Sequence, residues 1–145
     1  MFKFLVEEID NREKSAERIA YLEQKYGIVF PDILRQLYAK TDNSSEMHLC
    51  VFQIDGFEFE AAELISLDTE EYSFEYVADM DRKNGFLPSE YYPLMYDRGG
   101  ATFYWSADSQ KVFFVTDDDI ENPTLISESI EAFFELLDNS IVEEE

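Results

Sequence analysis

Few side chains in this chain could carry out covalent chemistry. Its single histidine, His48, lies two positions from its single cysteine, Cys50. If both lie on one strand they point to the same face, where an imidazole can take the proton of a thiol nucleophile. A small buried cysteine that acts only in packing is the commoner arrangement. We therefore expect no catalytic residue and no enzyme activity.

The adjacent glycines Gly99 and Gly100 raise the question of a phosphate-binding loop. The stretch around them, YDRGGATFYWS, has neither the Gly-Lys-Ser/Thr ending of a Walker loop nor the three spaced glycines of a dinucleotide motif. Adjacent glycines ahead of a strand more often form a turn or a bulge. We expect at least one of them at positive φ, no ligand pocket above them and no bound cofactor.

One acidic stretch resembles a calcium-binding loop. Its acidic positions are Asp117, Asp119, Glu121 and Glu128. Asn122 stands where such loops usually have glycine, and the residues before Asp117 are typical of a strand rather than a helix. Calcium binding by residues 117–128 stays open at this stage, but a solvated acidic strand end is favoured, and we assign no metal ligand.

A second pattern has the form of a metal-dependent nuclease site. Pro31-Asp32 is followed at a distance by Asp81-Arg82-Lys83. In such sites the acidic residues lie on strands around the metal, whereas Pro31-Asp32 is at the start of a predicted helix. A metal-dependent hydrolase is therefore the less favoured interpretation.

The formal net charge is −22, and nearly all of it belongs to one part of the chain. Residues 1–48 carry seven Lys and Arg against nine Asp and Glu, a net of −2, and residues 49–145 carry four against twenty-four, a net of −20. Such a field repels nucleic acid and anionic membranes and attracts a basic protein. No apolar stretch approaches the length of a membrane span. We expect a cytoplasmic protein with a protein partner.

Apolar periodicity predicts the helices that position these residues. One helix follows Asp10 or Asn11 and ends at Gly27, and a second runs from Pro31 to about Thr41. A third is predicted over 68–85 and a fourth over the last apolar repeat, with Ser127 as its N-cap. The stripes predicted for the third and fourth helices are Tyr72, Tyr76 and Met80, and Ile126, Ile130, Phe133, Phe134 and Leu137.

Two hairpins are predicted between these helices. Residues 48–54 and 57–64 flank Gly56, and 101–106 and 111–116 flank the turn sequence ADSQ. The alternation of Phe57 and Phe59 with Glu58 and Glu60 is typical of a strand with one solvated face. A length of 145 residues fits a single domain, 1–145, and the last residues from about 139 form an acidic tail.

The order of these segments resembles a known family. IAYLEQKYGIVFPDILRQLY, RGGATFYWSADSQKVFFVTDDD and LISESIEAFFELL are similar to the opening, later and closing segments of the SUKH superfamily, the Smi/Knr-like proteins. The resemblance implies an α+β fold with helices packed on a central, largely antiparallel sheet. It also implies an immunity protein that binds and silences a cognate bacterial toxin, often a nuclease.

The candidate partner-binding residues are carboxylates. They are Asp117, Asp118, Asp119 and Glu121 at a strand end, and Glu58 and Glu60 on the solvated face of an earlier strand. We expect them to cover the basic substrate channel of a toxin in a 1:1 complex, without nucleic acid or membrane contact. A regulatory interaction module without a toxin partner is the main alternative.

Overall fold

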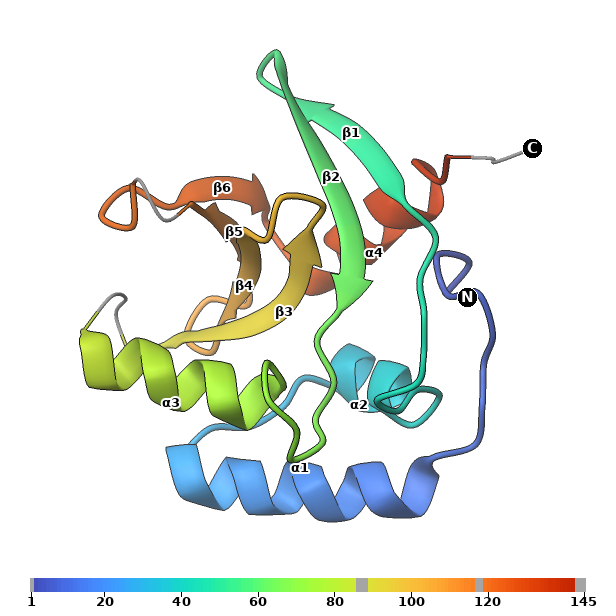
Figure 1. Cartoon of the computed structure of the whole chain (residues 1–145), viewed down its shortest axis with the longest axis vertical. Helices are drawn as coiled ribbons and strands as arrows, with labels where there is room; N and C mark the ends of the chain where they lie inside the picture. The colour runs from blue at the N-terminus through green and yellow to red at the C-terminus, as the bar shows by residue number, and fades with distance from the viewer. Residues whose placement is uncertain (1, 86–88, 117–118, 143–145) are drawn as a thin grey trace.

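The computed structural model describes residues 2–85, 89–116 and 119–142 (Figure 1). In these residues helices precede, interrupt and follow a single sheet. The elements are α1 (Arg12–Tyr26), α2 (Asp32–Tyr38), β1 (Cys50–Ile54), β2 (Phe57–Leu64), α3 (Phe74–Asn84), β3 (Tyr91–Asp97), β4 (Thr102–Ser106), β5 (Val112–Val115), β6 (Thr124–Ser127) and α4 (Ile130–Asp138).

The sheet has six strands in the order β1-β2-β3-β4-β5-β6, and each pairs antiparallel with the next. Every connection therefore joins neighbours in the sheet, and α3 lies within the connection between β2 and β3. The predicted α+β fold with helices on an antiparallel sheet is confirmed. The hairpins predicted around Gly56 and ADSQ are the β1–β2 and β4–β5 pairs.

One face of the sheet, which we call the inner face, carries the core. Phe103 and Trp105 of β4 are fully buried on it, and the ring centroid of Phe103 lies 5.4 Å from that of Phe133 in α4. Phe30, between α1 and α2, lies 5.5 Å from Trp105. In Figure 1 α4 lies behind β2, and α1 and α2 lie at the bottom of the view. These three helices, together with Phe74 of α3, supply apolar side chains that cover the inner face.

The opposite face, which we call the outer face, has less cover. Alternation along the strands places Glu58 and Glu60 of β2 on this face, with Tyr96 of β3 and Tyr104 of β4. The register shift between Ala61 and Glu63 brings Glu63 to the same face, opposite Tyr96. Helix α3 reaches it at one place, where the Tyr104 hydroxyl donates to Asp81 Oδ2 at 2.9 Å. Glu58 and Glu63 are exposed on the outer face and Tyr96 is half-buried there, whereas Tyr104 is buried at 5% exposure.

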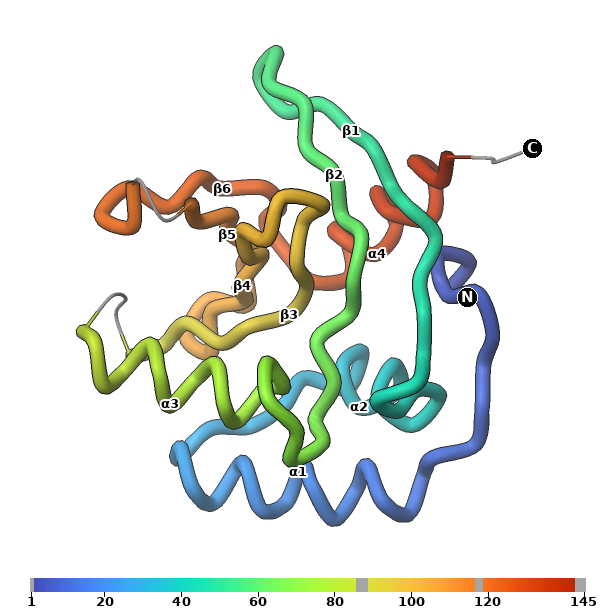
Figure 2. Tube along the Cα trace, viewed as in Figure 1, coloured from blue at the N-terminus to red at the C-terminus, as the bar shows by residue number. Residues whose placement is uncertain are grey.

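The chain ends lie close to β1 and α4 (Figure 2). The backbone N–H of Phe4 donates to Asp138 Oδ1 at 3.0 Å. After α4, the carbonyl oxygen of Ser140 accepts from Val51 N at 3.0 Å, and Val142 N donates to the Leu49 carbonyl at 2.8 Å. These bonds cover part of the free edge of β1, and such cover limits unwanted strand pairing.

The helix over 68–85 differs from its prediction. It begins at Phe74, and its buried face carries Phe74 and Ala78. The predicted repeat is exposed: Tyr72, before the helix, is 62% exposed, and Tyr76 and Met80 are each 40% exposed. Both sets share the same four-residue spacing, so periodicity alone could not decide between them. The predicted helix is confirmed with a later start, and the repeat that predicted it lies at the surface.

Two strands were not predicted. β3 contains Pro93, and the sheet register shifts between Pro93 and Met95, a bulge that accommodates a residue without an N–H. β6 contains Ile126, which fits the helical repeat of α4 but lies before that helix. The N-cap is Ser129, whose hydroxyl accepts from Ala132 N at 3.0 Å, rather than Ser127.

The prediction for the first helix is confirmed by its end. Gly27 has φ 68°, and its N–H donates to the Glu23 carbonyl, which closes α1 in a left-handed cap. Asn11 precedes the helix without a side-chain cap, because its amide donates to the Thr41 carbonyl instead. None of the helices in the described residues combines the length and apolarity needed to cross a bilayer.

Candidate protein-binding surface

An open hollow of about 560 Å³ lies where β2 extends past the turn between β3 and β4. Pairing of β2 with β3 begins only at Ala61, so residues 57–60 pair with β1 alone. The rings of Phe59 and Phe114 meet edge to face there, with centroids 5.1 Å apart. The lining residues are Glu58, Phe59, Glu60, Asp97, Arg98, Gly99, Phe114 and Thr116. We refer to this feature as the β2–β5 hollow.

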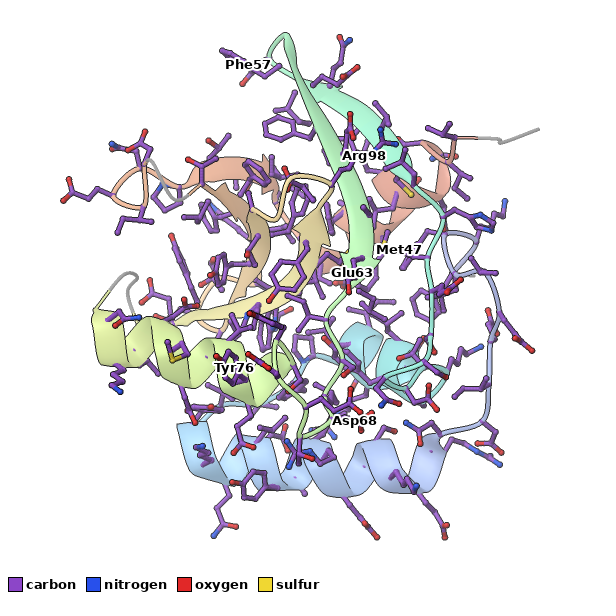
Figure 3. The ribbon with its side chains drawn as sticks, viewed as in Figure 1. Met47, Phe57, Glu63, Asp68, Tyr76 and Arg98 are labelled. Carbon is purple, nitrogen blue, oxygen red and sulfur yellow. The ribbon has the colours of Figure 1, made fainter. Side chains whose placement is uncertain are left out.

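Two predicted partner-binding residues line this hollow. Glu58 is exposed, and it forms no ion pair within the described part of the chain. Glu60 is half-buried, and its Oε2 lies 3.0 Å from Arg98 Nε. Figure 3 shows Arg98 beside β2, with Phe57 above it at the tip of the β1–β2 hairpin. The charge of Arg98 thus compensates that of Glu60, whereas the Glu58 carboxylate faces solvent.

The other predicted residues belong to the connection between β5 and β6. Asp117 and Asp118 lie outside the described residues. Asp119 is exposed, its N–H donates to the Thr116 carbonyl at 3.2 Å, and Thr116 lines the hollow. Glu121 is exposed further along the connection. The fold therefore brings Glu58 and Glu60 to the strand end that precedes the aspartates, whereas no described contact joins them to Glu121.

Gly99 and Gly100 form a turn, as predicted. Gly100 has φ 93° and its N–H donates to the Asp97 carbonyl at 3.2 Å. The Asp97 carboxylate accepts from Ala101 N at 2.8 Å. Because a carboxylate already occupies this backbone donor, the turn is unsuited to hold a phosphate. The expectation that no pocket borders the glycines is wrong, since Gly99 lines the β2–β5 hollow.

His48 and Cys50 do not form a catalytic pair. His48 lies before β1 and is exposed, whereas Cys50 is fully buried, so the two do not share a face. The Cys50 thiol donates to the His48 carbonyl oxygen at 3.4 Å. Burial raises the pKa of this thiol to about 12, and the nearby Asp138 adds to the shift. A thiol held in its neutral form is a poor nucleophile.

The two metal-binding patterns do not assemble in the part of the chain that the structure describes. Residues 119–123 connect two paired strands, where a calcium loop would need flanking helices. Asp119 Oδ1 accepts from the Asn122 amide at 2.8 Å, and Glu128 Oε2 lies 3.4 Å from Lys111 Nζ. Asp32 and Asp81 lie on helices rather than strands. In the described ranges no three His, Cys, Asp or Glu side chains are placed to hold a metal ion.

The carboxylates between α1 and α3 have basic partners. Glu75 Oε2 lies 2.8 Å from Lys25 Nζ and accepts from the Tyr21 hydroxyl at 2.6 Å, and its other oxygen lies 3.3 Å from Arg18 Nη2. Burial opposes the charge of Glu75, but the hydrogen bonds from Lys25, Tyr21 and Arg18 outweigh burial and lower the pKa of this carboxyl to about 2. Basic residues of the first part of the chain are thus neutralised inside the fold.

Comparison with known proteins identifies one family. The family model of SMI1 / KNR4 (SUKH-1) matches residues 14–136, which is most of the chain. The match extends from within α1 to near the end of α4 and includes all six strands. None of the curated proteins matches the chain.

Proposed function

Because the chain belongs to the SMI1 / KNR4 family (SUKH-1), we propose that it is a non-catalytic immunity protein that binds and neutralises a cognate bacterial toxin. The family match agrees with the resemblance seen in the sequence segments. The whole chain, 1–145, acts as one binding domain in the cytoplasm. The chain and the toxin form a 1:1 complex, in which the bound chain sterically blocks the toxin.

The observation that carries this proposal is the β2–β5 hollow. It places an unpaired carboxylate, Glu58, beside the apolar edges of Phe59 and Phe114, and it borders Thr116 at the start of the acidic connection. Aromatic anchors surrounded by charged residues are the composition that protein interfaces favour. A net charge of −22 selects basic partners from a distance.

The proposed mechanism is exclusion of substrate. A nuclease toxin binds nucleic acid through a channel lined with Lys and Arg, and an acidic surface seated on that channel competes for the same positive charges. The candidate residues of that surface are Glu58, Glu60, Asp119 and Glu121, together with Asp117 and Asp118, which lie outside the described residues. Long-range attraction accelerates association, so binding slows as salt rises. No residue of this chain needs to react.

Coexpression with the open reading frame next to its gene tests the proposal. We expect the two products to copurify, and we expect this chain to restore growth to cells that express the neighbour. Copurification without toxicity of the neighbour would instead support a regulatory module. A neighbour that neither binds nor harms cells would overturn the proposed function.

Charge reversal locates the surface. We expect Glu58→Lys and the triple change of Asp117, Asp118 and Asp119 to lysine to abolish growth rescue. The matched controls are Glu17→Lys and the triple change of Glu13, Glu17 and Glu135 to lysine, because these glutamates are exposed on α1 and α4 and have no ion pair in the described residues. Equal loss with the controls would show that only total charge matters.

A further inference from the structure

A group of tyrosines on the outer face comes from four parts of the chain. Tyr72 and Tyr76 meet edge to face with ring centroids 5.5 Å apart, and the Tyr96 hydroxyl lies 3.5 Å from the Tyr72 carbonyl oxygen. Glu63 is the register partner of Tyr96 in the sheet. We use the name tyrosine surface for these tyrosines together with two carboxylates of the same face. Its residues are Glu63, Tyr72, Tyr76, Asp81, Tyr96 and Tyr104.

The side chain of Tyr72 does not serve the core. Its φ is 64°, a left-handed conformation that a bulky residue rarely adopts and that costs stability. Its side chain is 62% exposed, so burial does not repay that cost. A glycine would make the same turn without strain. A strained and exposed aromatic residue indicates a binding role rather than a packing role.

The tyrosine surface also contains carboxylates without a basic partner. Asp81 is half-buried, and the hydroxyl of Tyr104 is its hydrogen-bond donor. The adjacent Arg82 turns away, because its guanidinium donates to the carbonyls of Ala78, Ser89 and Tyr91. Among the described residues, neither Asp81 nor Glu63 forms an ion pair. Burial raises the pKa of the Asp81 carboxyl above its ordinary value, because it outweighs the Tyr104 hydrogen bond and the charge of Arg82, which both favour the ionised form.

From this geometry we infer that the tyrosine surface binds an arginine side chain of a protein partner. A guanidinium stacks on tyrosine rings and donates two parallel hydrogen bonds to a carboxylate, so it meets both features of the surface at once. The chain already makes such contacts internally: the Arg82 guanidinium lies 4.3 Å from the Tyr92 ring centroid, and that of Arg18 lies 5.0 Å from Tyr21. A lysine ammonium is a point charge and fits less well.

This inference takes its protein partner from the proposed function. The surface that it concerns, however, is a different part of the outer face. The β2 residues that line the β2–β5 hollow are near the start of that strand, whereas Glu63 is near its end and closer to α3. In Figure 3 Glu63 is below Arg98, and Tyr76 is lower still, on α3. A partner seated on the hollow therefore can place an arginine on the tyrosine surface as a second contact.

Peptide binding tests the surface without the partner. The probe is Ac-Gly-Arg-Gly-Arg-Gly-amide at about 150 mM sodium chloride, which screens distant charges. In NMR spectra of the full chain we expect the ring signals of Tyr72, Tyr76 and Tyr96 to shift, and the matched lysine peptide to bind about fivefold more weakly, the size of a lost stacking contact. Unmoved rings, or equal binding of the two peptides, would overturn the inference.

Variants provide the second readout. Tyr72→Gly removes the ring together with the strained φ, so the protein should melt no lower than the parent and yet bind the arginine peptide about fivefold more weakly. Asp81→Asn should weaken binding at least as much. The controls are Val29→Ala and Glu131→Gln, an exposed apolar residue and an exposed carboxylate away from this surface. Controls that lose as much as the variants would contradict the inference.

The partner itself separates this inference from the proposed function. If the neighbouring gene product copurifies with the parent but equally well with Tyr72→Gly and Asp81→Asn, the function stands and the arginine contact is absent. If no partner copurifies while the peptide still moves the tyrosine rings, the surface stands and the toxin proposal fails.

Discussion

Two of the three carboxylates of helix α3 have surroundings that differ sharply. Glu75, in its first turn, faces α1 and contacts Lys25, Tyr21 and Arg18. Asp81, further along the same helix, faces the sheet and receives one hydroxyl, that of Tyr104. Burial disfavours the charge of both. Basic neighbours nevertheless lower the pKa of Glu75 to about 2, whereas the pKa of Asp81 is raised.

The difference is one of internal partners, and under the proposed function it separates charges that stabilise the fold from charges that bind a partner. Charges between α1 and α3 are neutralised within the fold, so they hold two helices together. On the outer face, Glu60 pairs with Arg98, whereas Asp81 has no ion pair among the described residues, and its raised pKa means that its charge costs stability. The aromatic side chains are divided as well, because Phe133 lies in the core whereas Tyr72 and Tyr76 are exposed.

Phe133→Ala measures how much one residue of the inner face contributes to the free energy of unfolding. Its ring is fully buried, with centroids 5.4 Å from Phe103 and 6.2 Å from Phe52. Removing it should lower the free energy of unfolding by about 3 to 5 kcal/mol, since the transfer energy is lost and a cavity remains. Urea denaturation measures the change. A loss near zero would show that α4 does not anchor the inner face.

Glu75→Gln should cause the next largest loss. The amide cannot form an ion pair with Arg18, which would stay half-buried without a carboxylate, or with Lys25, which would keep Asp79 alone. We therefore expect about 1.5 to 3 kcal/mol of destabilisation. Glu71→Gln is the control, because Glu71 is exposed just before the same helix, and its change should stay within about 0.5 kcal/mol. Equal effects of the two would mean that the contacts of Glu75 add nothing.

The pH dependence of the unfolding free energy tests the contribution of Glu75 a second way. The carboxyl of Glu75 has an ordinary pKa of 4.5 and a pKa of about 2 in the fold, so its contribution is complete above about pH 4.5 and is lost as pH falls toward 2. Unfolding free energy of the parent should therefore decrease over that range more steeply than that of Glu75→Gln. Parallel curves for the two proteins would remove Glu75 from the acid transition.

Elements with local signals were predictable from the sequence. Gly27 marks the end of α1, and short polar turns mark the β1–β2 and β4–β5 hairpins. β3 was missed because Pro93 normally excludes a central strand, and only the bulge beside it makes the pairing possible. β6 was missed because Ile126 continues the periodicity of α4. Ser73 directly before Phe74 was a usable sign that α3 begins late.

The candidate site was only partly predictable for a different reason. Strand alternation correctly placed Glu58 and Glu60 on a solvated face, but their approach to Thr116 depends on how far β2 extends past its neighbours. The tyrosine surface joins a loop, a helix and three strands, and no spacing in the sequence encodes that meeting. The repeat of Tyr72, Tyr76 and Met80 predicted a helix, but apolar periodicity does not distinguish a buried stripe from an exposed one.

Asp81→Asn should have the smallest effect on stability and the opposite sign to Glu75→Gln. A carboxyl whose folded pKa is raised destabilises the fold once pH exceeds its ordinary value, so removing the charge should raise the unfolding free energy at neutral pH, by at most about 1 kcal/mol. The asparagine oxygen can still accept from Tyr104, so packing is kept. Chemical denaturation at pH 7 and near pH 3 measures the change, and the gain should disappear at the lower pH, where the carboxyl is neutral. A loss comparable to that of Glu75→Gln would mean that Asp81 already has a stabilising partner within the chain, and the surface would then have no need of an arginine from outside.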